Sequence, residues 1–244
     1  MAATAEYDLF IRGIQVFKDR IGKDSYLQNI PALKKLDKFS FKSPVTFFCG
    51  ENGSGKSTLM EAIAVSYGFN PEGGTKNYSF STFDTHSELC DSLGLIRGIK
   101  KPKWGYFLRA ESYYNVATAE HEYGQAPGGQ PQFLHERSHG ESLLYTAQSN
   151  FRPESLFLLD EPEAALSPQR QLTLLYEIHR CMKEGSQFII ATHSPILLGL
   201  PGADILSFDG ELHFISYEET DSYQVMKTFI NNRSLMLKRL LGED

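Results

Sequence analysis

Apolar runs alternate along the chain with glycine-rich and polar segments, and this alternation predicts strands and helices in turn. Residues 44–49 and 155–159 are almost wholly apolar, which is typical of strands buried on both faces of a sheet. Residues 57–67 place apolar side chains at helical spacing and are followed by Gly68, a frequent helix stop. The order strand, glycine-rich loop, helix predicts an α/β fold with a mainly parallel core sheet.

Further elements follow from the same two periodicities. Strands are predicted at residues 7–17, 104–109, 187–191, 204–208 and 211–217. Helices are predicted from Ser138 to about 150, from Ser167 to Gly185 and over residues 222–241. The apolar stripe of the second helix is predicted to consist of Leu172, Leu175, Ile178 and Met182.

The chain of 244 residues is long enough to bury one sizeable core, so we expect residues 1–244 to form a single domain. Residues 70–103 and 115–135 are dense in turn-forming residues, and we expect them to be loops or insertions on that core.

Composition narrows the class of protein. The formal net charge of −6 gives no global field that would recruit nucleic acid or an anionic membrane, although a local basic groove stays open. No run approaches the roughly 18–20 apolar residues that a membrane span needs, and the first residues lack a signal-peptide layout, so we expect a cytoplasmic protein. Cys49, Cys90 and Cys181 are widely spaced, which predicts small buried residues and no disulfide framework or zinc site.

Residues 50–58 carry the strongest chemical signal. They read Gly-Glu-Asn-Gly-Ser-Gly-Lys-Ser-Thr, which fits G-x-x-x-x-G-K-[ST], between a predicted strand and a predicted helix. Such a loop turns backbone N–H groups onto phosphates, while Lys56 reaches the β- and γ-phosphates and Ser57 offers a hydroxyl to Mg²⁺. The predicted ATP-binding residues of the loop are Gly50, Asn52, Gly53, Ser54, Gly55, Lys56, Ser57 and Thr58.

Two acids end the apolar strand at 155–159. Asp160 is predicted to bind Mg²⁺ directly or through water, as a metal ligand beside Ser57. Glu161 is predicted to orient and deprotonate the water that attacks the γ-phosphate. This pair favours ATP hydrolysis over the chemistry of GTPases and small-molecule kinases.

Five motifs in order make the chain resemble the ABC ATPase family. They are the phosphate loop, Ser138-His-Gly-Glu-Ser142, Asp160-Glu161, Ala165-Leu-Ser167 and Thr192-His-Ser194. The resemblance is to small stand-alone predicted ATPases of the AAA-family kind, near the recombination and chromosome-maintenance ATPases. It implies an ABC-type head with an antiparallel N-terminal sheet and a helical signature subregion at about 105–150. No heptad repeat separates Lys56 from Ser138, so a coiled-coil arm between them is not expected.

The resemblance also implies roles for residues outside the two strongest motifs. Ser138 and Gly140 would contact the γ-phosphate of ATP bound to a partner subunit, and His193 would sense that phosphate. Glu111 stands where the family usually has a glutamine that completes magnesium coordination, and Arg109 or Glu111 could instead be structural ion-pair partners. For adenine stacking, the upstream aromatics Phe17 and Tyr26 are candidates.

These residues imply a homodimer that closes head-to-tail over two Mg-ATP molecules, with Lys56, Glu161 and His193 as the catalytic set. Hydrolysis would open the dimer and act on a nucleic-acid or protein client that the sequence leaves open. The alternatives are the ATP-binding subunit of a membrane transporter and a nucleotide-dependent switch with little turnover. A small-molecule kinase is a weaker alternative, because it would leave Ser138 and His193 without a task.

Overall fold

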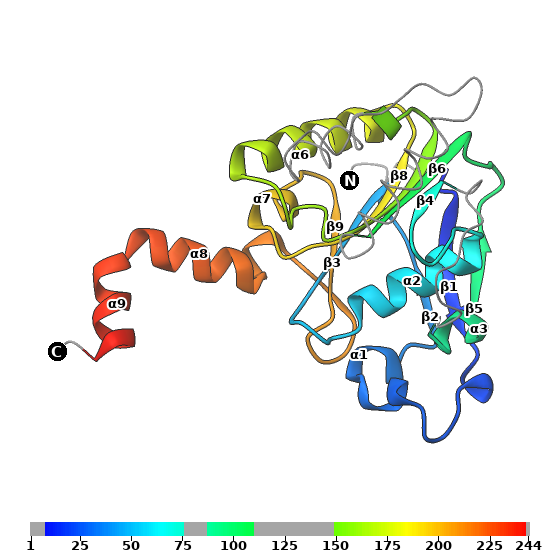
Figure 1. The fold of residues 1–244 in the computed structure, drawn as a ribbon, viewed down its shortest axis with the longest axis horizontal. Helices are drawn as coiled ribbons and strands as arrows, with labels where there is room; N and C mark the ends of the chain where they lie inside the picture. The colour runs from blue at the N-terminus through cyan, green and yellow to red at the C-terminus, as the bar shows by residue number, and fades with distance from the viewer. Residues whose placement is uncertain (1–7, 76–86, 110–148, 243–244) are drawn as a thin grey trace, which may run out of the picture.

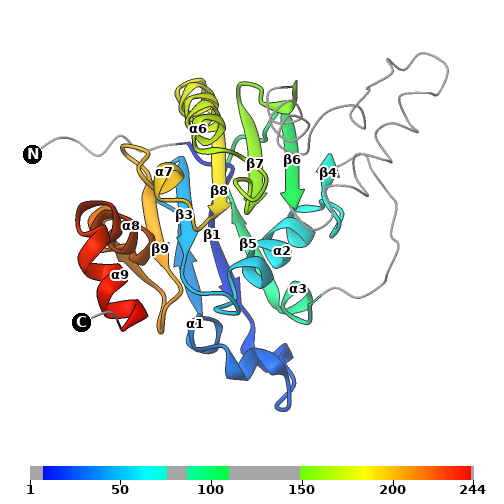
Figure 2. The same ribbon diagram turned by 60° about the vertical axis from the view of Figure 1, so that its left-hand side comes forward.

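The computed structural model of the chain describes residues 8–75, 87–109 and 149–242, which form two β-sheets and the helices packed on them (Figure 1). The larger sheet has seven strands in the order β10-β9-β3-β8-β7-β6-β4, and most of this order can be followed in Figure 2. The strands are β3 (Val45–Cys49), β4 (Gly74–Thr75), β6 (Trp104–Arg109), β7 (Ser155–Asp160), β8 (Gln187–Ala191), β9 (Asp204–Ser207) and β10 (His213–Ile215).

The larger sheet is parallel at its centre and antiparallel at its two edges. Strands β9, β3, β8, β7 and β6 pair in parallel, while β10 pairs with β9 and β4 pairs with β6 in antiparallel fashion. This arrangement confirms the predicted mainly parallel core sheet. Because parallel central strands are covered on both faces, β3, β7 and β8 are buried along their whole length.

Helices cover the two faces of this sheet differently. On one face, α2 (Lys56–Tyr67) lies between the two sheets and shares a buried cluster with Phe48 and Leu158. On the other face, α6 (Pro168–Lys183) and α7 (Pro195–Leu198) share a cluster with Phe47 and Phe157. Neighbouring residues of one strand therefore face opposite layers, although the sequence shows only an unbroken apolar run.

The smaller sheet is antiparallel, as predicted for the N-terminal region, with the order β2 (Lys38–Ser40), β1 (Ile11–Val16) and β5 (Leu93–Arg97). The expectation that residues 70–103 are loops or insertions is wrong for β5. This strand pairs along β1, with Ile14 opposite Leu95, and α3 (Leu89–Ser92) leads into it. The segment therefore completes the core.

A buried side chain ties the two sheets together. The Gln187 amide at the start of β8 accepts a hydrogen bond from the Ile11 backbone N–H at 2.9 Å and donates to the Ile11 carbonyl at 2.8 Å. Gln187 is 2% exposed, so both halves of the amide need these partners.

Two helix predictions need correction. On α6, Leu174, Ile178 and Cys181 are buried, and Leu175 and Met182 pack partly buried against the same cluster. The predicted stripe is therefore wrong only at Leu172, which is 56% exposed. The single helix expected over 222–241 is two helices, α8 (Asp221–Asn231) and α9 (Arg233–Leu241), which meet at Asn232 with φ −132° and ψ 35°.

The remaining short elements are η1 (Lys18–Arg20), η2 (Tyr26–Asn29), α1 (Pro31–Lys34) and η4 (Tyr217–Glu219). The helical signature subregion predicted at about 105–150 lies mostly outside the described residues. All three cysteines are buried and free, as predicted.

Candidate nucleotide-binding site

Loops that follow parallel strands meet at one edge of the core sheet. The loop after β3 contains the glycine-rich motif, the loop after β7 contains Glu161, the loop after β8 contains His193, and Asp209 follows β9. Parallel strands bring their carboxyl ends to one edge, which is where open α/β sheets bind ligands. The topology therefore gathers these side chains from 160 residues of sequence.

The glycine-rich loop has a backbone shape that other residues rarely adopt. Gly50, Gly53 and Gly55 have φ values of +137°, +80° and +102°. A Cβ atom at Gly55 would also lie 2.9 Å from Cγ2 of Ile30. Glycine at position 55 therefore meets two separate requirements, the left-handed backbone and the close approach of α1.

The Lys56 side chain lies inside the glycine-rich loop and bonds to its backbone. Its ammonium donates hydrogen bonds to the carbonyl oxygens of Gly50 and Glu51, each at 2.8 Å, and the residue is 4% exposed. Burial lowers the pKa of Lys56 below its ordinary value, and the charges of Glu161 and Asp209 oppose part of that shift. The ammonium is held by carbonyl oxygens, which a phosphate could replace as the stronger, charged acceptor.

Ser57 and Asp160 bring two oxygen ligands together. The Ser57 hydroxyl donates to Oδ1 of Asp160 at 3.1 Å, and Asp160 is 6% exposed. A hydroxyl and one carboxylate suit Mg²⁺, which takes its other ligands from nucleotide phosphates and water. Among the described residues, no group of three or more His, Cys, Asp or Glu could hold a metal ion. Because the Ser57–Asp160 pair supplies one hydroxyl and one carboxylate, it fits a metal whose other ligands are nucleotide phosphates and water.

Glu161 and His193 face each other across the loops after β7 and β8. Oε1 of Glu161 lies 3.8 Å from Nε2 of His193, and both side chains are about 40% exposed. The Glu161 backbone has φ +49°, which costs energy for a non-glycine residue, while its N–H donates to the Ala191 carbonyl at 2.9 Å. This contact with β8 holds a strained turn that presents the carboxylate to solvent at the mouth of the site.

Glu163 organises the His193 loop, and the sequence patterns did not identify it. Its Oε1 accepts from the Thr192 hydroxyl at 2.6 Å and from the His193 backbone N–H at 2.7 Å. Nearby, the Ser194 hydroxyl donates to the Gln171 side chain at 2.6 Å. The third acid in the run Asp160-Glu161-Pro162-Glu163 was the available signal, but its role requires knowing which loop packs beside it.

Asp209 was also missed. Its Oδ1 accepts from the Glu51 backbone N–H at 2.9 Å, so it fixes the outer turn of the glycine-rich loop. A cavity of about 490 Å³ lies beside this contact, lined by the glycine-rich loop, the His193 loop and the start of α8. The site is therefore open on the side where α8 leaves the body.

Other predicted site residues have different outcomes. Ser138, Gly140 and Glu111 lie outside the described residues. Arg109 makes an ion pair of 2.8 Å with Glu61 of α2, which matches the structural alternative for that arginine.

The two aromatic candidates for adenine stacking also differ. Phe17 lies under the Arg20 guanidinium at 4.6 Å. Tyr26 remains 49% exposed, with its hydroxyl 2.6 Å from the Ser87 hydroxyl. Of the two, Tyr26 keeps a ring face that a base could reach, and its role stays a prediction.

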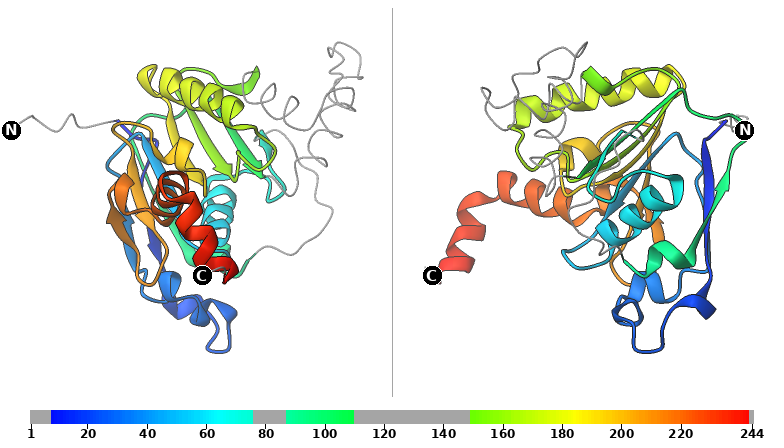
Figure 3. Two further views of the ribbon diagram at one scale, coloured as in Figure 1. Left: turned by 90° about the vertical axis from the view of Figure 1, so that its left-hand side faces the viewer. Right: turned by 45° about the vertical axis from the view of Figure 1, so that its right-hand side comes forward.

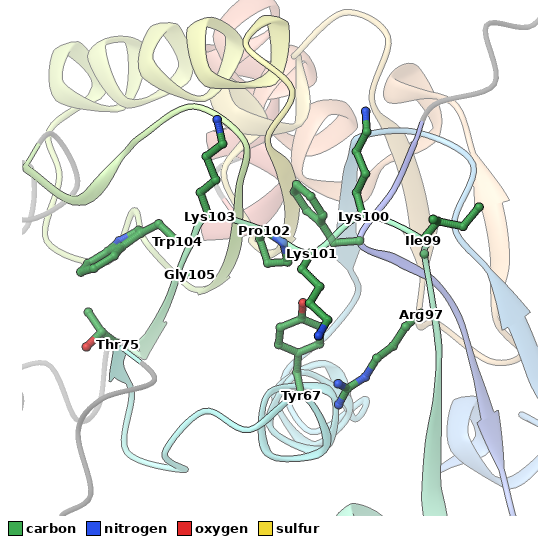
Figure 4. A pocket seen from close by; sticks show the side chains of 12 residues that line it. Tyr67, Thr75, Arg97, Ile99, Lys100, Lys101, Pro102, Lys103, Trp104 and Gly105 are labelled. Atoms are coloured by element: carbon green, nitrogen blue, oxygen red, sulfur yellow. The ribbon is translucent and has the colours of Figure 1, made fainter.

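We call the edge of the core sheet that bears the glycine-rich loop the nucleotide edge. A second pocket, of about 430 Å³, lies away from it, at the amino-terminal end of β6 (Figure 4). Lys101 extends toward Tyr67, whereas Lys100 and Lys103 point away from that ring. These last two lysines pair with Asp8 and Glu154. The pocket is basic, but acids of the same chain already neutralise part of its charge.

The fold and these loops define a P-loop nucleotide-binding protein of α/β class. Comparison with protein families matches residues 26–101 to a model described as "AAA domain" and residues 141–199 to one described as "AAA domain, putative AbiEii toxin, Type IV TA system". The two matches contain the glycine-rich loop and the Asp160 to His193 segment respectively.

Curated relatives specify the family. The cytochrome c biogenesis ATP-binding export protein CcmA of Rhizobium meliloti is 31% identical over 188 residues, covering 67% of this chain and 84% of the relative. The chain therefore belongs to the ABC-type ATP-binding family. The ribose import ATP-binding protein RbsA of Roseobacter denitrificans is 25% identical over 71% of this chain, which spans 38% of that relative's length.

A shorter match supports the predicted relationship to chromosome-maintenance ATPases. The DNA double-strand break repair Rad50 ATPase of Methanosarcina mazei is 55% identical over 40 residues, which are 16% of this chain and 4% of the relative. Within the described residues, no helix is long and apolar enough to cross a membrane.

Proposed function

We propose that the chain binds Mg-ATP at this edge of the core sheet and hydrolyses it. The observation that carries the proposal is the grouping of four side chains. The Ser57–Asp160 pair, at 3.1 Å, lies at the start of the helix that also bears buried Lys56, and the Glu161 carboxylate lies on the loop that follows Asp160. Membership of the ABC-type family supports the same assignment.

In the proposed reaction, the phosphates replace the Gly50 and Glu51 carbonyls as partners of Lys56, and the glycine-rich loop donates its N–H groups to them. Ser57 and Asp160 would hold Mg²⁺, which would supply positive charge against the β- and γ-phosphates. Glu161 orients the attacking water and accepts its proton as the oxygen bonds to the γ-phosphorus. The bond to the bridging oxygen breaks, which leaves ADP and phosphate.

His193 acts on the same phosphate. Its backbone is fixed by Glu163 and its ring lies 3.8 Å from Glu161, so a γ-phosphate and its water would fit against both side chains. A neutral imidazole can hydrogen-bond to the phosphate or to the water, and its contacts change when the phosphate leaves.

The active unit is proposed to be a head-to-tail homodimer. Ser138 and Gly140 of each subunit close on the γ-phosphate bound by the other, so that ATP joins the two subunits and hydrolysis lets them separate. The closed dimer binds ATP more tightly than ADP, and this difference in affinity drives closure and opening. A nucleic-acid or protein client would sense the closed form, and Glu111 would complete the metal site.

Removal of the proposed base separates binding from hydrolysis. We expect Glu161→Gln to retain ATP through gel filtration as a dimer with about one nucleotide per chain, and to release phosphate at least about 100-fold more slowly than the unmodified chain. Lys56→Ala, which should not retain ATP, is the matched control. A Glu161→Gln chain that stays monomeric in Mg-ATP would contradict the sandwich, and unchanged phosphate release would contradict the role of Glu161.

A second candidate is the ATP-binding subunit of a membrane transporter, because two relatives carry import or export functions in their names. A transporter subunit would work only with a membrane-embedded partner. The test is phosphate release by the purified chain in solution. A rate that does not depend on an added membrane partner favours the first proposal.

A further inference from the structure

The C-terminal helices α8 and α9 form an arm that projects from the body, as Figure 1 and the right-hand view of Figure 3 show. We define this arm as residues 221–242. Neither helix contains a buried residue. Met236 and Leu237 are half-buried, and seven further large apolar side chains are exposed by between 37% and 81%. These seven are Val225, Met226, Phe229, Ile230, Leu235, Leu240 and Leu241.

Within the described residues, hydrogen bonds at its root anchor the arm to the body. Thr220 is 2% exposed and donates through its hydroxyl to the Tyr217 carbonyl at 2.7 Å, and the Tyr217 hydroxyl donates to the Pro195 carbonyl at 2.9 Å. Beyond this point α8 carries Val225, Met226, Phe229 and Ile230 at i, i+1, i+4 and i+5, which places them on one face. Isolated helices of this length are marginal in water, so a second surface must cover that face.

Charge identifies the second surface. We define residues 209–221 as the acidic segment, because they contain five acids and no lysine or arginine: Asp209, Glu211, Glu218, Glu219 and Asp221. Within the chain, Asp209 and Glu219 accept backbone N–H groups and Glu211 pairs with Lys35, so Glu218 and Asp221 are the acids that the proposal uses. Residues 222–242 contain four bases and no acid: Lys227, Arg233, Lys238 and Arg239. The acidic segment and the basic part of the arm are thus neighbours in sequence. Because the arm projects from the body, the basic α9 lies away from the acidic segment of its own chain.

We propose that the arm is an interface with a second copy of this chain, formed without nucleotide. In a two-fold arrangement, the α8 helices pack antiparallel through the face that holds Phe229 and Ile230. Antiparallel packing brings the far end of one arm to the root of the other, so the basic α9 of each copy meets the acidic segment of its partner. A two-fold interface needs this self-complementarity, and the sequence supplies it.

An anionic membrane is the competing partner for a basic amphipathic arm. The acidic segment disfavours it, because five acids at the root would face the same negative surface as the bases. A second copy satisfies both charged segments, whereas a membrane satisfies one and repels the other.

Mass without nucleotide tests the proposal. We expect the purified chain at micromolar concentration to have twice its 27.5 kDa mass by light scattering. Phe229→Ser/Ile230→Ser should raise the dimer dissociation constant at least about 100-fold and give a monomer. The matched control is Leu172→Ser/Tyr176→Ser, which removes two apolar side chains of 56% and 64% exposure from α6 on the body and should leave the dimer intact. A monomeric unmodified chain, or a dimeric Phe229→Ser/Ile230→Ser variant, would overturn the proposal.

Charge reversal tests the geometry. Arg233→Glu/Lys238→Glu should weaken the dimer at least tenfold at low salt, and Glu218→Lys/Asp221→Lys should weaken it similarly. When the two variants are mixed, each arm meets a segment of opposite charge at both contacts, so a heterodimer tighter than either homodimer is expected. If the heterodimer in the mixture is as weak as the two homodimers, the charged residues do not meet across the interface.

The nucleotide sandwich and the arm fail in different ways. If the arm proposal is right, Phe229→Ser/Ile230→Ser is a monomer without nucleotide and still releases phosphate from ATP. If only the sandwich is wrong, the unmodified chain is a dimer without nucleotide, but Glu161→Gln combined with Phe229→Ser/Ile230→Ser stays monomeric when Mg-ATP is added. Pelleting of a monomeric chain with vesicles of anionic phospholipid, and loss of pelleting in the same variant, would replace the second copy with a membrane.

Discussion

The nucleotide edge and the C-terminal arm adjoin at Thr220, yet their side chains are held in opposite ways. At the nucleotide edge, Lys56, Asp160 and Glu163 each have polar partners within the chain at 2.6–3.1 Å. Along the arm, exposed apolar side chains have no cover from the described part of the body. The edge is prepared before a ligand arrives, whereas the arm requires a second molecule to complete its packing.

This difference shows which physical feature gives each region its specificity for a ligand or partner. Preorganised groups cost little further ordering when a ligand binds, so the nucleotide edge can favour one geometry strongly. An uncovered apolar face gains from any fitting surface, so its specificity comes from the charges beside it.

The largest expected effect is at the nucleotide edge. Lys56→Ala removes the buried cation that is proposed to hold the β- and γ-phosphates, and we expect phosphate release to fall by about 10²–10³-fold or more. Initial rates over a range of ATP concentrations measure the loss. Because Lys56 is buried in the body and takes no part in the face of α8 that holds Phe229 and Ile230, the mass of the chain without nucleotide should not change. Turnover within about twofold of the unmodified chain would exclude a catalytic role.

The next effect compares the same substitution in the body and in the arm. Leu158→Ala in β7 removes a side chain that is 0% exposed and should lower the free energy of unfolding by about 3 kcal/mol. Leu235→Ala in α9, at 50% exposure, should lower it by less than about 0.5 kcal/mol. Urea denaturation in the Phe229→Ser/Ile230→Ser background measures both without a dimer contribution. Equal losses would mean that the arm packs within its own chain.

Glu163 provides a smaller and more specific test. Glu163→Ala leaves the Thr192 hydroxyl and the His193 N–H without their shared acceptor, and we expect kcat to fall about tenfold, or about 1.4 kcal/mol, with the KM for ATP unchanged. Glu163→Gln keeps a carbonyl acceptor and should restore most of kcat. A loss in KM with no rescue by glutamine would indicate a general structural defect instead of positioning of His193.

The smallest effect concerns the buried thiols. Burial raises the pKa of Cys49 to about 12, of Cys90 to about 12 and of Cys181 to about 11, from an ordinary value of 9.0. Since each folded pKa lies above the unfolded one, the stability that they contribute is complete below pH 9 and is lost as pH rises through 11 to 12. We expect alkylation at pH 8.5 to be slow in the native chain and fast in denaturant. A triple cysteine-to-alanine variant should lose less stability between pH 8 and pH 10.5.

Much of the fold could be predicted because its strands are buried on both faces. The runs at β3, β7 and β8 are apolar throughout, and glycine or acid residues mark their ends. β5 could not be identified in this way, since Gly94 interrupts it and its residues are only partly buried. The two errors on α6 had a similar cause, because Leu172 is apolar but exposed, whereas Cys181 is fully buried and was not counted with the apolar residues.

Some residues of the candidate site could be predicted from sequence and others could not. Residues inside local motifs, such as Lys56, Ser57 and Asp160, could be predicted from sequence, and the structure brings them together. Glu163 and Asp209 could not, because each acts on a loop that is distant in sequence and adjacent only through strand order. The break between α8 and α9 also escaped detection, because the apolar spacing continues through Asn232.

The Gln187 amide gives the molecule an internal reporter. In most strands a backbone N–H is shielded by a neighbouring strand, but the Ile11 N–H is shielded by the Gln187 side chain from the other sheet. Deuterium would therefore replace this proton only when the two sheets part. Since β8 carries Gln187 at one end and leads to His193 at the other, the exchange rate of one amide can reveal whether events at the nucleotide edge loosen the joint between the sheets.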